Sequence, residues 1–260
     1  MDGGTDRPNS TPHPAYAALM RLAIFGDVHG NLPALEAALG DMAAHAPDAL
    51  VCLGDVAMDG AWPRECLQRV AALGCPVVRG NADRQMLEAP QSLDPRGFPD
   101  EREIHEIGQW SAAQLTEAER DILRTFTPTV ELQDLLCFHG SPARDDEVLD
   151  AATPPERLGE LRAQYGQQTV WIGGHTHQPL LRSLDSWRLL NPGSVGLPFE
   201  KRGGRYVNLA HAEYLLLDRV GQGWNVTFRR VPYELAALQA GILAAGMPHA
   251  QWLADGWVEG

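Results

Sequence analysis

The stretch LAIFGDVHGN, residues 22–31, decides how the rest of the sequence is interpreted. Its first four residues are apolar and Gly-Asp follows them, a pattern typical of a buried strand that ends in a loop. LPALEAALGDMAAH (32–45) comes next, with apolar residues at helical spacing. We therefore expect a strand, a loop that carries Asp27 and His29, and a helix in direct succession.

The same order recurs along the first third of the chain. ALVCLGD (49–55) predicts a second strand, WPRECLQRVAALG (62–74) a second helix, and PVVRGN (76–81) a third strand. Strands that alternate with helices predict a parallel sheet with helices packed on it.

The later part of the sequence changes from this alternation to β-structure. Thr116 and Glu119, within residues 103–124, stand in the positions of a capping box and predict the start of a helix there. The expected elements are, in order, a long loop over 88–102, two short amphipathic helices over 103–124, a hairpin over 129–140, a helix near 155–165, a buried strand within 169–177, four antiparallel strands (PLLRSL, WRLLNPG, AEYLLLDRV and WNVTFRRV), and a helix over 233–246.

Composition suggests where the folded part begins and ends. Residues 1–20 are rich in Pro, Gly, Ser and Thr, which predicts a disordered N-terminal tail. No linker interrupts residues 21–246, so we expect one domain there, followed by a C-terminal tail over 247–260. Either Met1 or Met20 could be the natural start.

Charge and composition narrow the classes of function. The formal net charge of −13 argues against long nucleic acids and anionic membranes, because both attract basic proteins. A small phosphorylated substrate remains compatible, since bound cations reverse the local field. No apolar run reaches the ~20 residues that span a membrane, and there is no signal-peptide pattern. The cysteines form no CxxC pair, which favours free thiols in a reducing compartment and hence the cytoplasm; they are Cys52, Cys66, Cys75 and Cys137.

Seven side chains that can bind metals follow predicted strands: Asp27, His29, Asp55, Asn81, His139, His175 and His177. Ligand sites assemble at the carboxyl ends of strands in parallel α/β sheets, so we expect these residues to converge on one rim. Two carboxylates, an amide and four imidazoles suit Mn, Fe, Zn, Co or Ni better than Ca, and the lack of Cys disfavours a structural zinc site. Two cations roughly 3.5–4 Å apart can activate a bridging hydroxide and clamp the oxygens of a phosphoryl group.

Each of these residues has an ordinary structural interpretation as well. An Asp after a strand often caps a helix, Gly-Asn is a common turn pair, and His139 could be a hydrogen-bonded core histidine. The combination favours metal binding. GHTH is the most specific local pattern, because histidines at i and i+2 point to the same side of an extended segment.

The motifs GDVHGN (26–31), GD (54–55), GN (80–81), HG (139–140) and GGHTH (173–177) resemble those of the calcineurin-like metallophosphoesterase superfamily, in the same order. The resemblance covers residues 21–230 and is strongest to the small bacterial and archaeal phosphodiesterase branch. It implies a four-layer α/β/β/α sandwich, in which two mixed β-sheets are flanked by helices. It implies one metal on Asp27, His29, Asp55 and His177, and a second on Asp55, Asn81, His139 and His175. Manganese is the first expectation, with Fe, Zn, Co or Ni as alternatives.

The sequence departs from the family pattern at one place. Many members carry a His directly after Gly-Asn that helps to protonate the leaving group, whereas this chain has Ala82 there. A general acid contributes typically ~10²–10⁴ in rate, so substrates with good leaving groups should be favoured. His105 and His211 are candidate replacement acids.

Candidate substrate contacts are less specific than the metal ligands. Asn31, Arg84 and Asn191 follow the motifs, but Asn31 could instead cap the next helix. Asp83 and Arg84 could steady the GNAD loop, and Asn191 could shape the turn beneath the site. Trp62, just past the GD loop, is the best candidate for a pocket wall.

These features favour a dinuclear metal-dependent hydrolase of phosphate esters that acts on small phosphodiesters, cyclic nucleotides among them. Phosphomonoesters and dinucleoside polyphosphates are the alternative substrates. An alternative of another class is a metal-binding scaffold for protein partners with little catalysis, which the complete ligand set disfavours. The acidic charge disfavours a nuclease that acts on polymers. A homodimer contact could form through the C-terminal helix and the tail with Trp252 and Trp257.

Overall fold

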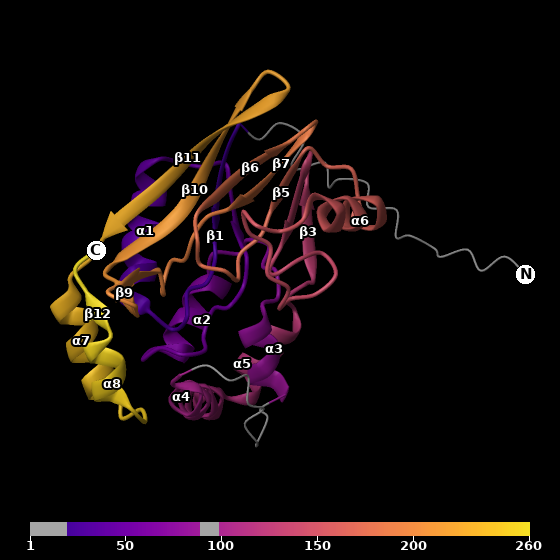
Figure 1. Ribbon diagram of the computed structural model, residues 1–260. Coiled ribbons are helices and arrows are strands. Elements are labelled where there is room, and N and C mark those ends of the chain that lie inside the picture. Colours follow the sequence, from indigo (N-terminus) through magenta and orange to yellow (C-terminus); the bar gives the residue numbers. More distant parts are fainter. Residues whose placement is uncertain (1–19, 89–98) are drawn as a thin grey trace, which may run out of the picture.

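The computed structural model describes residues 20–88 and 99–260 (Figure 1). The first predicted strand is β1 (Arg21–Phe25), and its side chains alternate between two buried faces. Leu22 and Ile24 belong to one apolar cluster, whereas Ala23 and Phe25 belong to another. Because both faces of β1 are covered, its sequence is a continuous apolar run rather than an alternating one.

The first sheet has the order β11-β10-β1-β2. β1 pairs in parallel with β2 (Ala49–Cys52) and antiparallel with β10 (His211–Val220), which in turn pairs with β11 (Gly223–Pro232). The expected helices α1 (Leu32–Ala44) and α2 (Pro63–Ala71) pack in the cluster that contains Phe25. They form the outer layer on this side.

The second sheet has the order β3-β4-β5-β7-β6. Its strands are β3 (Thr129–Leu132), β4 (Leu135–Phe138), β5 (Val170–Ile172), β6 (Leu180–Leu184) and β7 (Trp187–Asn191). β3 and β4 form the expected antiparallel hairpin, and β4, β5 and β7 run parallel.

The two sheets pack face to face. Leu22 and Ile24 of the first sheet share an apolar cluster with Leu135 and Ile172 of the second. On the far face of the second sheet, Trp171 packs in a cluster with residues of α6 (Pro155–Tyr165), which Figure 1 shows beside this sheet. The layers therefore follow the order helix, sheet, sheet, helix, and the expected fold is confirmed.

Three further helices are α3 (Asn81–Glu88), α4 (Glu101–Gln114) and α5 (Glu117–Arg124), and Figure 1 shows them below the sheets. The last two are the expected amphipathic pair. The capping box is confirmed, because Thr116 Oγ1 accepts from Glu119 N at 3.4 Å and Glu119 Oε2 accepts from Thr116 N at 2.8 Å. Most of the long loop expected over 88–102 lies outside the described residues, which resume with residue 99.

The prediction of a third strand over residues 76–81 is wrong. Val77 and Val78 form only single bridges, to Cys52 and Thr127, and Asn81 is the first residue of α3. Pro76 has no N–H to donate to a ladder. The segment stays extended only long enough to bring Asn81 to the edge of the sheets.

A small third sheet was not expected. It has the order β12-β9-β8 and consists of β8 (Phe199–Arg202), β9 (Arg205–Leu209) and β12 (Trp257–Val258). Gly203 and Gly204 join β8 and β9 with positive φ angles of 56° and 86°, a backbone conformation that favours glycine.

The C-terminal residues are folded, in contrast to the tail expected over 247–260. The expected helix is α7 (Leu235–Ala244), and α8 (Ala250–Asp255) and β12 follow it. Trp257 is only 5% exposed and packs with residues of α7 and α8 in one apolar cluster. This tryptophan fills the chain's own core rather than a dimer contact, whereas Trp252 is 37% exposed.

Two other expectations concern the termini and the cysteines. The tail expected over 1–20 lies outside the described residues, apart from Met20. All four cysteines are free, as expected, and three of them are buried.

None of the helices within 20–88 and 99–260 combines the length and apolarity of a membrane span.

Candidate metal centre

The structure brings the seven predicted ligands together at one edge of the two large sheets. Asp27 and His29 lie between β1 and α1, and the others follow β2, β4 and β5 or begin α3; these are Asp55, His139, His175, His177 and Asn81. Side chains from five separate loops thus meet, as the strand order predicts.

One group consists of Asp27, His29 and His177, all buried, with potential ligand atoms within 4.8 Å of one another. His177 Nε2 lies 3.4 Å from Asp27 Oδ1 and 3.1 Å from His29 Nε2. This group has the size and the donor types of one metal site.

A second group consists of Asp55, His139 and His175, again within 4.8 Å. His139 Nε2 lies 3.1 Å from Asp55 Oδ2 and 3.2 Å from Asn81 Oδ1. The His139 and His175 rings have centroids 5.4 Å apart. Asn81 therefore joins this group, as the family resemblance implies.

Asp55 lies between the two groups. Its Oδ2 is 3.7 Å from His29 Nε2 in the first group and 3.1 Å from His139 Nε2 in the second. Its other oxygen, Oδ1, accepts a hydrogen bond of 2.8 Å from the backbone N–H of Ala82. The backbone thus fixes this carboxylate with one oxygen toward both groups, as a ligand shared by two metal ions would require.

The imidazole rings are oriented by contacts behind them. His139 Nδ1 lies 2.7 Å from Leu53 O, and His177 Nδ1 lies 2.8 Å from Leu197 O. Since a carbonyl oxygen only accepts, each Nδ1 carries the proton and the Nε2 lone pair of a neutral ring points into the cluster. His29 Nδ1 similarly lies 3.4 Å from Asp59 Oδ2.

This arrangement fits divalent cations. Nitrogen lone pairs face one another and face buried carboxylate oxygens at 3.1 to 3.4 Å, and such groups repel unless positive charge lies between them. Mixed nitrogen and oxygen donors are the usual ligands of divalent transition metals.

The pKa values indicate the same need for positive charge. Burial opposes ionisation, yet the charge of Asp55 raises the pKa of His139 to about 10. Burial likewise acts against His29, but Asp59 and Asp55 raise its pKa to about 9. Burial would raise the pKa of Asp27, and His177 and His139 lower it below its ordinary value. A proton on His139 or His29 would supply part of the positive charge that a divalent cation would bring to this cluster.

The backbone at the cluster is in an uncommon conformation. Five of the seven residues have positive φ, which is uncommon outside glycine; these are Asp27 (52°), His29 (45°), Asp55 (51°), His175 (67°) and His177 (55°). Such positions cost of order 1–3 kcal/mol each and cluster at functional sites. Backbone bonds between loops hold them, including His29 N to Asp55 O at 2.9 Å.

Asp83 does steady the GNAD loop, and it also reaches the neighbouring loop. Its fully buried carboxylate accepts from Asp55 N at 2.8 Å, Val56 N at 3.0 Å and Gly80 N at 2.9 Å. Ser194, in the Pro-Gly-Ser segment expected to shape the turn beneath the site, donates through Oγ to Asp27 O at 2.8 Å. Asp59, behind His29, was not expected there. The only local signal for Asp59 is its Asp-Gly turn pair.

The three candidate substrate contacts all have partners within the protein. Asn31 caps α1 by accepting from Ala34 N at 3.1 Å. Arg84 Nε and Nη2 donate to Asp145 at 2.8 and 3.0 Å, which ties α3 to the loop after β4. Asn191 Nδ2 donates to Gly174 O at 2.6 Å, beneath the histidine loop.

The candidate acids do not join the cluster directly. His105 lies half-buried on α4, and His211 Nε2 lies 3.2 Å from Glu213 Oε1. Within the described part of the chain, neither forms a hydrogen bond or ion pair with one of the seven residues.

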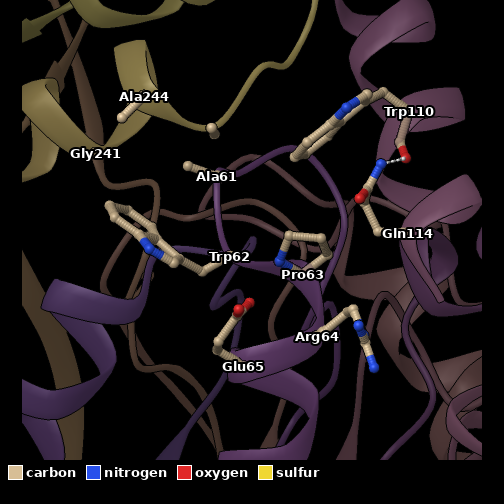
Figure 2. A pocket seen from close by; sticks show the side chains of 10 residues that line it. Ala61, Trp62, Pro63, Arg64, Glu65, Trp110, Gln114, Gly241 and Ala244 are labelled. Carbon is tan, nitrogen blue, oxygen red and sulfur yellow. Dashed lines mark hydrogen bonds between the residues drawn. The ribbon is translucent and has the colours of Figure 1, made fainter.

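Trp62 lines a pocket of about 390 Å³ between α2, α4 and α7. Figure 2 shows its indole on one side and that of Trp110 on the other. The backbone N–H of Trp62 donates to Gly30 O at 3.0 Å, next to His29. None of the seven predicted ligands lines this pocket.

Comparison with known proteins gives a consistent result. Residues 20–213 match the family model of the calcineurin-like phosphoesterase superfamily domain. An uncharacterized protein of Methanocaldococcus jannaschii is 26% identical over 257 residues, which cover 90% of this chain and 96% of that protein.

Two solved structures are similar over most of their length. A metallophosphoesterase from Sphaerobacter thermophilus is 29% identical, with a TM-score of 0.71 and coverage of 92% of this chain and 98% of that chain. A hypothetical protein from Pyrococcus horikoshii is 19% identical, with a TM-score of 0.73 and coverage of 90% and 97%, and shares the fold. The family expected from the motifs is confirmed.

Proposed function

Because the chain belongs to the calcineurin-like phosphoesterase superfamily, we propose that it hydrolyses phosphate esters with two divalent cations held by the seven clustered residues. The observation that carries this proposal is the convergence of imidazole Nε2 atoms on Asp55 Oδ2 from both sides. One group would use Asp27, His29 and His177, and the other His139, His175 and Asn81.

The protein's own part in the reaction is to hold and orient. Two divalent cations in this place would neutralise the charge of phosphate oxygens and activate water for attack. The carbonyls of Leu53 and Leu197 fix the rings of His139 and His177, and the backbone of Ala82 fixes Asp55. Manganese is our choice of metal, with Fe, Zn, Co and Ni as alternatives for the same donors.

Small phosphodiesters are the proposed substrates. The net charge of −13 disfavours polymers with phosphate backbones. Ala82 provides no side-chain proton to a leaving group, which favours esters whose leaving group needs little help. Free cysteines, three of them buried, fit a reducing compartment such as the cytoplasm.

The test combines metal analysis with an assay on bis-p-nitrophenyl phosphate in manganese. We expect about two metal ions per chain and activity on this diester above that on p-nitrophenyl phosphate. Asp55→Asn and His139→Ala should lower kcat/KM by roughly 10²-fold or more. Asp185→Asn, in an exposed turn between β6 and β7, is the matched control and should retain activity.

Two outcomes would contradict the proposal. Full activity of Asp55→Asn would refute the site assignment. Two bound metals without turnover of any phosphate ester would instead favour the scaffold alternative. A higher rate on the monoester would change only the substrate class to phosphomonoesters.

A further inference from the structure

The β8–β9 hairpin, residues 199–209, lies next to the proposed metal centre. His177 and Phe199 have ring centroids 6.0 Å apart. Gln178, the residue after His177, donates through Nε2 to Phe199 O at 3.2 Å. The base of the hairpin is therefore attached to the histidine loop that supplies His177.

One face of this hairpin continues from the metal centre into solvent. Lys201 pairs directly with Tyr206, and Phe199 lies two residues before Lys201, so these three side chains share a face. The Phe199 and Tyr206 centroids are 5.5 Å apart, and Lys201 Nζ lies 5.6 Å from the Tyr206 ring. Tyr206 is 68% exposed. We call Phe199, Lys201 and Tyr206 the hairpin face.

The charge of this segment is opposite to that of the whole chain. Residues 199–206 contain three cations, Lys201, Arg202 and Arg205, and one anion, Glu200, which gives a local charge of +2. The whole chain has −13, and Lys201 is its single lysine. An exposed aromatic ring with a cation over it, beside a phosphoester site, is a surface suited to an anion that carries a planar ring.

We propose that the hairpin face binds the organic part of the substrate, and that this part is a nucleobase. The inference rests on the proposed function and specifies its substrate as a nucleotide-type phosphodiester. A phosphate at the metal centre would place its nucleoside along the row of rings from His177 to Tyr206. The base would stack on Tyr206, and Lys201 would attract the negative charge of the nucleotide.

The test compares the affinities of two phosphate monoesters for the manganese-loaded protein, measured by calorimetry. Adenosine 5′-monophosphate and ribose 5-phosphate share the sugar phosphate, and only the first has a base. We expect the nucleotide to bind about tenfold more tightly, the magnitude of one base–aromatic stack. Tyr206→Ala should bring its affinity to that of ribose 5-phosphate, whereas Tyr206→Phe should keep the preference. Phe228→Ala, at an exposed ring on β11, should change neither affinity.

The outcomes separate this inference from the proposed function. Equal affinities in the wild type, or a nucleotide preference that survives Tyr206→Ala, would overturn the proposal that the hairpin face binds a nucleobase. Light scattering that shows a dimer lost only in Tyr206→Ala, with both ligands bound alike, would also overturn it and assign the face to a second copy. Activity on methyl p-nitrophenyl phosphate, which carries no base, tests the proposed function separately.

Discussion

At position 82 the backbone contacts the site, but the side chain has no proton to donate. Ala82 N donates to Asp55 Oδ1 at 2.8 Å, and the methyl group is buried. We therefore predict that the rate of hydrolysis falls steeply as the leaving group becomes more basic. A general acid typically contributes a factor of ~10²–10⁴ in rate, and poor leaving groups should lose a factor of that order here. A series of substituted phenyl phosphodiesters measures this dependence.

A flat dependence in that series would show that another group donates the proton. His105→Ala and His211→Ala would then identify it, since only the variant that lacks the true acid should become sensitive to the leaving group. His45→Ala, at the end of α1, is the matched control.

Asp83 is a positioning residue, because it touches the backbone of the Asp55 loop rather than the cluster. Asn at this position has one acceptor oxygen for three N–H donors and would turn its own N–H₂ toward them. We predict that Asp83→Asn lowers stability by about 1–3 kcal/mol and metal affinity by about 10–100-fold.

Metal titration and thermal unfolding of the same Asp83→Asn protein check this prediction. Loss of stability with unchanged metal affinity would contradict the positioning role. Asp185→Asn, on the surface, controls for the loss of one negative charge.

At the scale of elements, α5 depends on its N-terminal cap. Burial would raise the pKa of Glu119, but hydrogen bonds from Thr116 and Arg64 lower it from 4.5 to about 2. Because the pKa is lower in the folded state, the contribution to stability is present above pH 4.5 and is lost as the pH falls toward 2. We predict that Glu119→Gln destabilises the protein at pH 7 and much less near pH 3.

Thermal unfolding at several pH values measures this effect. Thr116→Ala should cost about 1 kcal/mol through the lost cap, and Thr116→Ser should cost little. A difference between wild type and Glu119→Gln that is independent of pH would contradict the assigned role of the carboxylate.

Sequence periodicity predicted the elements that bury an apolar face and missed those defined by other interactions. The runs that became β1, α1 and β4 are long or strongly apolar. The β8–β9 hairpin is polar and exposed, and its one signal was the Gly203–Gly204 pair. The third strand did not form because Pro76 has no N–H to donate and Gly80 N donates to the Asp83 carboxylate, so only Val77 and Val78 form bridges.

At the scale of the whole molecule, the meeting of five loops could be predicted, because the order of strands determines which loops share an edge. The four-layer arrangement was implied by the family resemblance rather than by the pattern of strands and helices. The position of Asp59, the packing of Trp257 in the core and the aromatic row beside His177 could not be predicted. They depend on contacts between residues far apart in sequence that no short pattern records.

Anomalous diffraction from crystals grown with manganese tests the central claim most directly. We predict two peaks roughly 3.5–4 Å apart, one among Asp27, His29 and His177 and one among His139, His175 and Asn81, with Asp55 touching both. A single peak, or peaks away from these side chains, would contradict the two-metal account of this protein.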